Sequence, residues 1–316
     1  MKKESKHWGR WLRNGAMALV TVVVVLIIGA IAWDYYDSNR TIDDYPPRGE
    51  FVPVGTAEMH VICQGSGSPT LVMQPGIAGG ALDWLPVMEE LAVSNRVCAF
   101  DRLGQDWSDP ALQPRTFATT ADEWHQALQA LGIEQPVVVG HSLGGAVVQI
   151  YASKYDVAGI ILIEGLSADA AEAVVKRLGT YESLNLLSRV GLLRPLGTLF
   201  SDAGYPGELR SEMIALRSRS STILNISAEG ALAASTAVDE LKAAEAQMSA
   251  PLLIIAAESN ELPESEQFLQ ALRNLDARYI DSTFVSIPDA KHYVIATHPA
   301  LVANTITDWI DKRNIE

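Results

Sequence analysis

The stretch VVVGHSLGG, Val137 to Gly145, constrains the fold more than any other part of this chain. Three consecutive β-branched residues suit a strand that is buried on both faces, as in a parallel sheet. The residues that follow the glycines, AVVQIYASKY, carry apolar side chains at helical spacing. Ser142 is therefore expected where a buried strand turns abruptly into a helix, with glycines on both sides to relieve the crowding.

Short apolar runs alternate with helical patterns along most of the remaining chain. This alternation predicts an α/β sheet that is covered by helices on both faces. Eight strands are predicted, at Phe51–Val54, Met59–Cys63, Thr70–Gln74, Arg96–Phe100, Pro136–Val139, Gly159–Ile163, Pro251–Ala256 and Tyr279–Ile287. Helices are predicted at Leu82–Ala92, Ala118–Leu131, Leu143–Lys154, Asp239–Met248, Glu264–Asn274 and Pro299–Asp311.

One segment breaks the alternation. Residues 167–235 contain helix-like pieces that are interrupted by RPLG and AGYPGEL, and they contain no convincing strand. This pattern predicts a helical insertion between two strands of the sheet. The expected organisation is a core of residues 48–166 and 236–316, with residues 167–235 as a helical cap.

The N-terminus predicts a single transmembrane helix. The segment 15–33 contains no charged residue, and nineteen helical residues span close to the roughly 30 Å of a bilayer core. A basic flank at residues 1–14 favours a cytoplasmic start, and residues 34–47 are interpreted as a linker to an exported domain. The alternative is a signal peptide that is cleaved after AIA, Ala30 to Ala32, which would release a secreted protein.

The net charge and the cysteine content limit the kinds of partner and metal site that are expected. The formal net charge is −14, and an acidic surface repels phosphate backbones, so no nucleic-acid partner is expected. Cys63 and Cys98 lie in two predicted strands without the spacing of a zinc site, and no metal is expected. A disulfide between them and two buried free thiols both remain open.

The segment GHSLG, Gly140 to Gly144, matches G-x-S-x-G between a strand and a helix. Together with LVMQPGIAGG, VCAFDRLGQDWSDP and AKHYVIATHP, it resembles the α/β-hydrolase fold family from about residue 48 to the C-terminus. The resemblance is closest to membrane-anchored bacterial serine hydrolases of the esterase type. It implies a mostly parallel eight-stranded sheet with a helical cap, and Ser142 as the nucleophile.

A serine hydroxyl needs a base to take its proton. His292 follows the last predicted strand and precedes Pro299, a favoured first residue of a helix, and it matches the position of the family's base. The other histidines are assigned to the basic flank, a strand, a helix face, the position beside the serine and the start of the last helix: His7, His60, His125, His141 and His298.

The acid of the triad is the least certain member from sequence. Asn260 occupies the position where the family usually has its acid. Some family members, such as the haloalkane dehalogenases that use Glu, place the acid one strand earlier, and Glu164 stands there, at the end of GIILIEG. A carboxylate that ends an apolar strand also needs a reason, and a triad supplies one. Glu258 and Glu261 are the reserve candidates.

An oxyanion hole needs two N–H donors. Leu143, at the start of the helix after the serine, is the first candidate. The resemblance implies that the loop QPGIAGG supplies the second, from Ile77, because Pro75 has no N–H. The nearby Trp84 is interpreted as a core residue. The family-like turn residues Asp101, Arg102 and Ser108 are interpreted as structural, and Asp106 stands where glycine is common.

These residues predict a serine hydrolase that cleaves carboxylic esters through an acyl-enzyme, with no cofactor. The leucine-rich segment 184–200 of the insertion favours a hydrophobic ester or contact with the membrane, although core packing would explain it equally well. Amide or N-terminal peptide cleavage and carbon–carbon bond hydrolysis use the same triad and remain open. The alternative of another class is a membrane-anchored binding module without catalysis.

Overall fold

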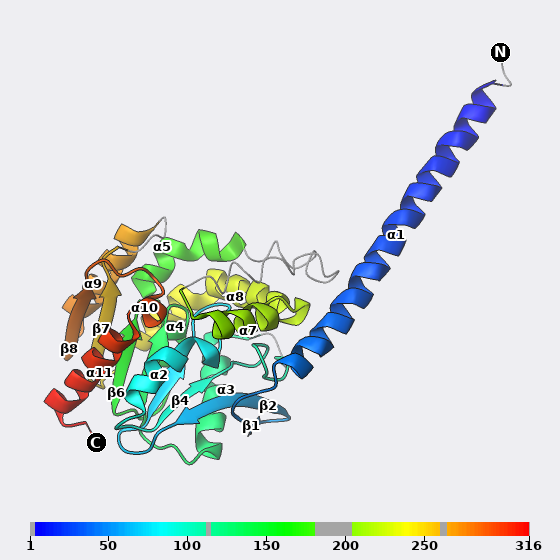
Figure 1. Cartoon of the computed structure of the whole chain (residues 1–316). Helices are drawn as coiled ribbons and strands as arrows, with labels where there is room; N and C mark the ends of the chain where they lie inside the picture. The colour runs from blue at the N-terminus through cyan, green and yellow to red at the C-terminus, as the bar shows by residue number, and fades with distance from the viewer. Residues whose placement is uncertain (1–3, 112–114, 181–203, 260–263, 316) are drawn as a thin grey trace.

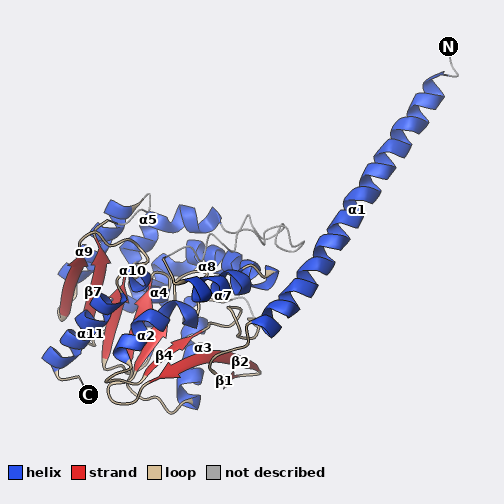
Figure 2. Ribbon diagram, viewed as in Figure 1, coloured by secondary structure: helices blue, strands red, loops and turns tan. Residues whose placement is uncertain are grey.

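A computed structural model describes residues 4–111, 115–180, 204–259 and 264–315 of the chain. Its centre is an eight-stranded sheet in the order β1-β2-β4-β3-β5-β6-β7-β8 (Figures 1 and 2). The first two strands form antiparallel pairs, β1 with β2 and β2 with β4, and all other neighbours are parallel. The strands are β1 Glu50–Val54, β2 Ala57–Gln64, β3 Leu71–Gln74, β4 Val97–Phe100, β5 Val137–His141, β6 Gly159–Ile163, β7 Leu252–Ala257 and β8 Ser282–Ile287. The predicted sheet is confirmed.

Helices cover both faces of this sheet (Figure 2). Alternate residues of β5 show the division, since Val138 packs into the core on one face while Val137 and Val139 pack into the core on the other. Every residue of β3 to β7 is buried, which explains why these strands have continuous apolar sequences. The core helices are α2 Leu85–Leu91, α3 Phe117–Ala130, α4 Gly144–Lys154, α9 Ser265–Arg278, α10 Val294–Thr297 and α11 Pro299–Arg313, with a 3₁₀ turn at Ala81–Trp84.

The described parts of the insertion between β6 and β7, residues 168–180 and 204–245, are largely helical, as the sequence predicts. Its described helices are α5 Ala168–Gly179, α7 Gly207–Arg217 and α8 Ser220–Glu245, which lie on the upper side of the sheet in Figure 1. The predicted boundary between residues 235 and 236 falls inside the continuous helix α8. An alanine-rich sequence keeps this helix unbroken from the cap into the core. The leucine-rich segment 184–200 lies outside the described residues.

Helix α1, Glu4–Asp44, projects away from the domain (Figure 1). It is long and apolar enough to cross a membrane, and no part of its most apolar window is buried against the domain, so it is a candidate transmembrane span or signal sequence. The predicted linker at residues 34–47 is helical as far as Asp44, so most of it extends the apolar helix. The residues that follow the helix contact the domain. The Trp107 indole N–H donates to the Tyr45 carbonyl at 3.0 Å, and Arg48 Nε donates to Glu212 of α7 at 3.1 Å.

Cys63 and Cys98 form a disulfide, which resolves the alternative that the sequence left open. The two residues are direct partners in the antiparallel pairing of β2 with β4. The two thiols, 35 positions apart in the chain, thus meet because the strand register places them side by side.

Candidate active site

Ser142 lies at the tight turn between β5 and α4. Its φ is +51°, a left-handed conformation that is rare for a residue with a side chain. The glycines around it are needed for close packing. A Cβ on Gly144 would lie 2.2 Å from the Gln74 carbonyl oxygen, and one on Gly140 would lie 2.5 Å from the Gly144 carbonyl oxygen. This turn brings the serine to the carboxyl edge of the sheet.

His292 faces Ser142 from the loop between β8 and α10. Its Nε2 lies 3.0 Å from Ser142 Oγ, although the two residues are 150 positions apart. The imidazole is 13% exposed, so one side of it is open to solvent or substrate. The histidine that matched the family's base position is thus the one within hydrogen-bond distance of the serine.

Glu164 completes the line of contacts. One carboxylate oxygen, Oε2, lies 3.2 Å from His292 Nδ1, and the other, Oε1, accepts a 2.7 Å hydrogen bond from the Ala257 N–H. A carboxylate accepts only, so Nδ1 carries the imidazole proton and Nε2 is free to accept the hydroxyl proton of Ser142. The strand register explains why Ser142 and Glu164 lie at the same edge of the sheet. His141 of β5 pairs with Ile163 of β6, and the residues that follow them are Ser142 and Glu164.

Of the two reserve acids, Glu258 alone lies within the described residues, and it pairs with Ser286. Glu258 is exposed, and its Oε1 accepts a 2.6 Å hydrogen bond from the Ser286 hydroxyl. Glu261 and Asn260 lie outside the described residues. Glu164 is 1% exposed, and its φ of +48° is left-handed, as at Ser142. A strained backbone at both positions is typical of residues that the surrounding structure holds in place for function.

The oxyanion-hole candidates border the serine. A Cβ on Gly76 would lie 3.6 Å from Ser142 Oγ, so the loop that leads into Ile77 closely approaches the nucleophile. Leu143 is the N-cap of α4, where N–H groups have no partner inside the helix. Within the described residues, the N–H groups of Ile77 and Leu143 donate no hydrogen bond. Both are therefore available to a negatively charged oxygen.

His141 has a role that the sequence did not reveal. The buried His141 ring lies beside the ring of His292, with 5.1 Å between the ring centroids, and its Nε2–H donates to the His292 carbonyl at 2.9 Å. Burial, together with the charge of His292, lowers the pKa of His141 to about 3. A neutral imidazole thus holds the backbone of the His292 loop. The rule that a buried polar ring needs a partner was the only sequence signal for it.

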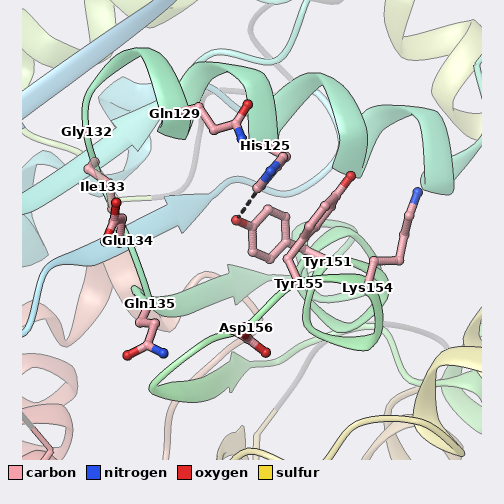
Figure 3. Close-up of a pocket in the computed structure, with 10 residues that line it drawn as sticks. All are labelled: His125, Gln129, Gly132, Ile133, Glu134, Gln135, Tyr151, Lys154, Tyr155 and Asp156. Atoms are coloured by element: carbon pink, nitrogen blue, oxygen red, sulfur yellow. Dashed lines mark hydrogen bonds between the residues drawn. The ribbon is translucent and has the colours of Figure 1, made fainter.

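A separate surface hollow of about 890 Å³ lies at the opposite end of β5 (Figure 3). It is bordered by the end of α3, the residues that precede β5, and the end of α4. Here the rings of His125 and Tyr155 stack with their centroids 3.7 Å apart, which agrees with the assignment of His125 to a helix face. The strand β5 separates this hollow from Ser142, so it is not part of the candidate site.

The site is suited to nucleophilic acyl transfer. It lines up Ser142, His292 and the buried carboxylate of Glu164, and two N–H groups that donate no hydrogen bond within the described residues lie near the serine. The family model for the alpha/beta hydrolase fold matches residues 69–299 of the chain. The chain belongs to the α/β-hydrolase fold family. Its matched region includes the whole candidate site and the insertion between β6 and β7.

Two curated relatives of this chain carry the name of a carbamate hydrolase. "Putative carbamate hydrolase RutD" of Azorhizobium caulinodans is 33% identical over 93 residues, which is 29% of this chain and 35% of that protein. The same protein of Escherichia coli O1:K1 / APEC is 34% identical over 97 residues, 30% of this chain and 36% of that protein. This chain thus matches about a third of the length of these curated relatives.

Solved structures show the same fold at low identity. A thermophilic esterase from Thermogutta terrifontis has a TM-score of 0.66 at 21% identity, covering 83% of this chain and 98% of that one. An enol-lactonase from Burkholderia xenovorans LB400 has a TM-score of 0.60 at 16% identity, covering 83% and 100%. These likenesses establish the α/β-hydrolase fold and leave the substrate to be argued from the site.

A buried carboxyl lies below the cap of this α/β-hydrolase, in the loop after β4. Asp106 has a φ of +34°, which explains why glycine is common at this position. Burial, and the carboxylates of Asp101 and Asp83, raise the pKa of Asp106 to about 7, against the opposing charges of Arg217 and Arg219. The folded protein therefore keeps a proton on Asp106 that the unfolded chain releases near pH 4.

Asp106→Asn is expected to raise Tm by a few degrees at pH 8 and to leave it unchanged at pH 4. Between pH 4 and 7 the folded state of the wild type holds more protons than the unfolded state, so its stability falls as the pH rises through this window. Asparagine carries no charge, so this component disappears in the variant. Thermal unfolding from pH 4 to 8, with Asp109→Asn as the exposed control, measures the effect. Parallel Tm curves for Asp106→Asn and wild type would contradict it.

Proposed function

We propose that this α/β-hydrolase is a serine esterase that cleaves carboxylic esters through an acyl-enzyme. The observation that carries the proposal is the continuous line of contacts from Ser142 Oγ to His292 at 3.0 Å and from His292 to Glu164 at 3.2 Å. The free N–H groups of Ile77 and Leu143 beside the serine add the second requirement of this chemistry.

In the proposed mechanism, Ser142 Oγ attacks the ester carbonyl while its proton moves to His292 Nε2. The Glu164 carboxylate stabilises the imidazolium that forms and keeps the ring in the productive tautomer. The N–H groups of Ile77 and Leu143 bind the oxyanion of the tetrahedral intermediate. His292 then protonates the departing alcohol, and a water molecule that His292 deprotonates releases the acid from Ser142.

The proposed substrate is a hydrophobic ester. Its support is the apolar sequence of the insertion, in particular the leucine-rich segment 184–200. A panel of p-nitrophenyl esters of increasing acyl length tests this, and the highest kcat/KM is expected for acyl chains longer than acetyl. A maximum at acetate would contradict the hydrophobic assignment and leave the esterase proposal intact.

Cleavage of a C–N bond is the second candidate, because the curated relatives carry the name of a carbamate hydrolase. Aminoacyl p-nitroanilides, in which release of p-nitroaniline requires cleavage of a C–N bond, belong in the same panel. Higher kcat/KM for these compounds than for every ester would replace the esterase assignment and retain the site. Absence of turnover, together with absence of labelling by a fluorophosphonate probe, would instead favour a binding module.

We propose that α1 anchors the enzyme in a membrane, with the catalytic domain outside the cytoplasm. The basic flank before the apolar segment, the exposed apolar helix and the disulfide all support this arrangement. Immunoblots of membrane and soluble fractions, with protease treatment of spheroplasts, provide the test. Full-length protein in the membrane fraction that external protease digests is expected. A shortened, fully soluble protein would show instead that α1 is a cleaved signal sequence.

A further inference from the structure

A fully buried ion pair joins the cap to the loop that carries the oxyanion candidate. Arg102 follows β4, and Glu229 belongs to the cap helix α8; their side chains are 2% and 6% exposed. The pair is bidentate, with Arg102 Nε 2.8 Å from Glu229 Oε1 and Arg102 Nη2 3.0 Å from Glu229 Oε2. Such a fork-to-fork contact sets the orientation of the guanidinium as well as its position.

The other N–H groups of this guanidinium bind two consecutive backbone carbonyls and, at 3.4 Å, the side-chain oxygen of Gln74. Arg102 Nη1 donates to the Pro75 carbonyl at 2.6 Å, and Arg102 Nη2 donates to the Gly76 carbonyl at 2.9 Å. The Gly76 carbonyl also accepts a hydrogen bond from the Gly79 N–H at 3.2 Å, which closes the turn. One side chain therefore holds the two peptide units that precede Ile77.

The geometry of one peptide unit connects these contacts to the chemistry. The Gly76 carbonyl and the Ile77 N–H belong to the same planar trans peptide, so they point in opposite directions. A guanidinium that holds the carbonyl from one side therefore aims the N–H away from itself. Gly76 packs against Ser142 and His141, so this peptide borders the nucleophile. A hydrogen bond to the carbonyl also strengthens the N–H of the same peptide as a donor.

We infer that Arg102 and Glu229 are positioning residues, through which the docked cap holds the Ile77 N–H in its oxyanion-binding orientation. The inference rests on the proposed function, in which Ile77 is an oxyanion donor. It assigns to Arg102 more than the loop-shaping role that the sequence indicated. Neither side chain is placed to touch the substrate, and both act through the peptide between Gly76 and Ile77.

Arg102→Met is expected to lower kcat by about 10²-fold, the loss typical of one oxyanion donor, with little change in KM. The rate is expressed per Ser142 that reacts with a fluorophosphonate, so that misfolded protein is not counted. The inhibition constant of an alkyl trifluoromethyl ketone, which forms an oxyanion on the enzyme, is expected to rise by a similar factor. The constant of the matching secondary alcohol, which forms none, is expected to stay the same.

The double variant Arg102→Met/Glu229→Met separates positioning from stability. Glu229→Met leaves the buried guanidinium of Arg102 without its ion-pair partner, and Arg102→Met leaves Glu229 with a hydrogen bond from Gln105 and with Arg115 at 3.9 Å. Both single variants are expected to lower Tm, and removal of both charges is expected to restore part of the loss. The rate of the double variant is expected to stay about 10²-fold low, because the carbonyls of Pro75 and Gly76 still lack the guanidinium. Recovery of the rate together with Tm would overturn the inference and leave Arg102 a structural residue.

Arg217→Met is the matched control. Arg217 is equally buried on the cap helix α7, and its Nη2 pairs with Asp83 of the core at 2.8 Å. Among the hydrogen bonds between described residues, none joins Arg217 to Pro75 or Gly76. Its loss is expected to lower Tm and to leave the rate per labelled serine near wild type. A loss of rate equal to that of Arg102→Met would mean that cap docking in general is responsible, which contradicts the inference.

The design also distinguishes this inference from the proposed function. If the wild type neither reacts with the fluorophosphonate nor hydrolyses p-nitrophenyl esters, the proposed function fails before any variant is compared. If the wild type is active and Arg102→Met has the wild-type rate and the wild-type inhibition constant for the ketone, only the positioning role fails.

Discussion

Ser142→Ala is expected to lower kcat for p-nitrophenyl ester hydrolysis by about 10⁴- to 10⁶-fold, the largest effect of any single substitution in this chain. Alanine removes the oxygen that would form the acyl-enzyme, and His292 then has no hydroxyl to deprotonate. The methyl group fits the space of the serine at the same backbone position, so Tm is expected to change little. Steady-state hydrolysis and fluorophosphonate labelling measure the loss.

Ser153→Ala is the control for this substitution. Ser153 lies on α4, and its hydroxyl donates to the Ile150 carbonyl, away from His292. Its variant is expected to keep the wild-type rate and to be labelled. Turnover by Ser142→Ala within tenfold of wild type, or labelling that persists without Ser142, would show that another group carries the reaction.

Glu164→Gln is expected to reduce kcat by about 10⁴-fold through the tautomer of His292. The amide oxygen of the glutamine takes the Ala257 N–H that Glu164 Oε1 binds at 2.7 Å. Its NH₂ group then faces His292 Nδ1, which must become an acceptor and transfer its proton to Nε2. A protonated Nε2 cannot accept the proton of Ser142, so the site keeps its shape and loses its base.

Two measurements accompany this prediction. The variant Glu258→Gln alters an exposed carboxylate that binds Ser286, and it is expected to retain the wild-type rate. Thermal unfolding of Glu164→Gln is expected to remain cooperative, because the substitution keeps the shape of the side chain. Near wild-type turnover of Glu164→Gln, with a large loss in Glu258→Gln, would transfer the role of the acid to the later loop.

The strands of the sheet could be predicted from the sequence because each strand depends on a short run of neighbouring residues. Continuous β-branched runs such as VVV predict strands that are buried on both faces, and these strands are found at the predicted places. The strand-turn-helix around Ser142 was predictable for the same reason, since a cramped turn requires the glycines that stand there. Element boundaries were less predictable, as α8 and the end of α1 show. In both places helix-forming residues continue past the predicted boundary, so the sequence does not mark where the helix ends.

Contacts between distant segments were predictable only in part. The resemblance indicated His292 and placed Glu164 first among three acids, and the fold brings these two side chains to Ser142. Whether Cys63 and Cys98 are bonded depended on the register of β2 against β4, which neither cysteine specifies by itself.

The sequence alone determined the parallel α/β core, the turn that carries Ser142, the candidate membrane helix and the acidic charge. Each of these depends on the order and spacing of neighbouring residues. Only the tertiary structure decided which carboxylate faces His292, that the His141 ring holds the His292 loop, and that Arg102 joins the cap to the loop before Ile77. The pairs Glu164–His292, His141–His292 and Arg102–Glu229 lie 127 to 151 positions apart in the chain. Burial leaves each polar group only the partner that packing puts within reach.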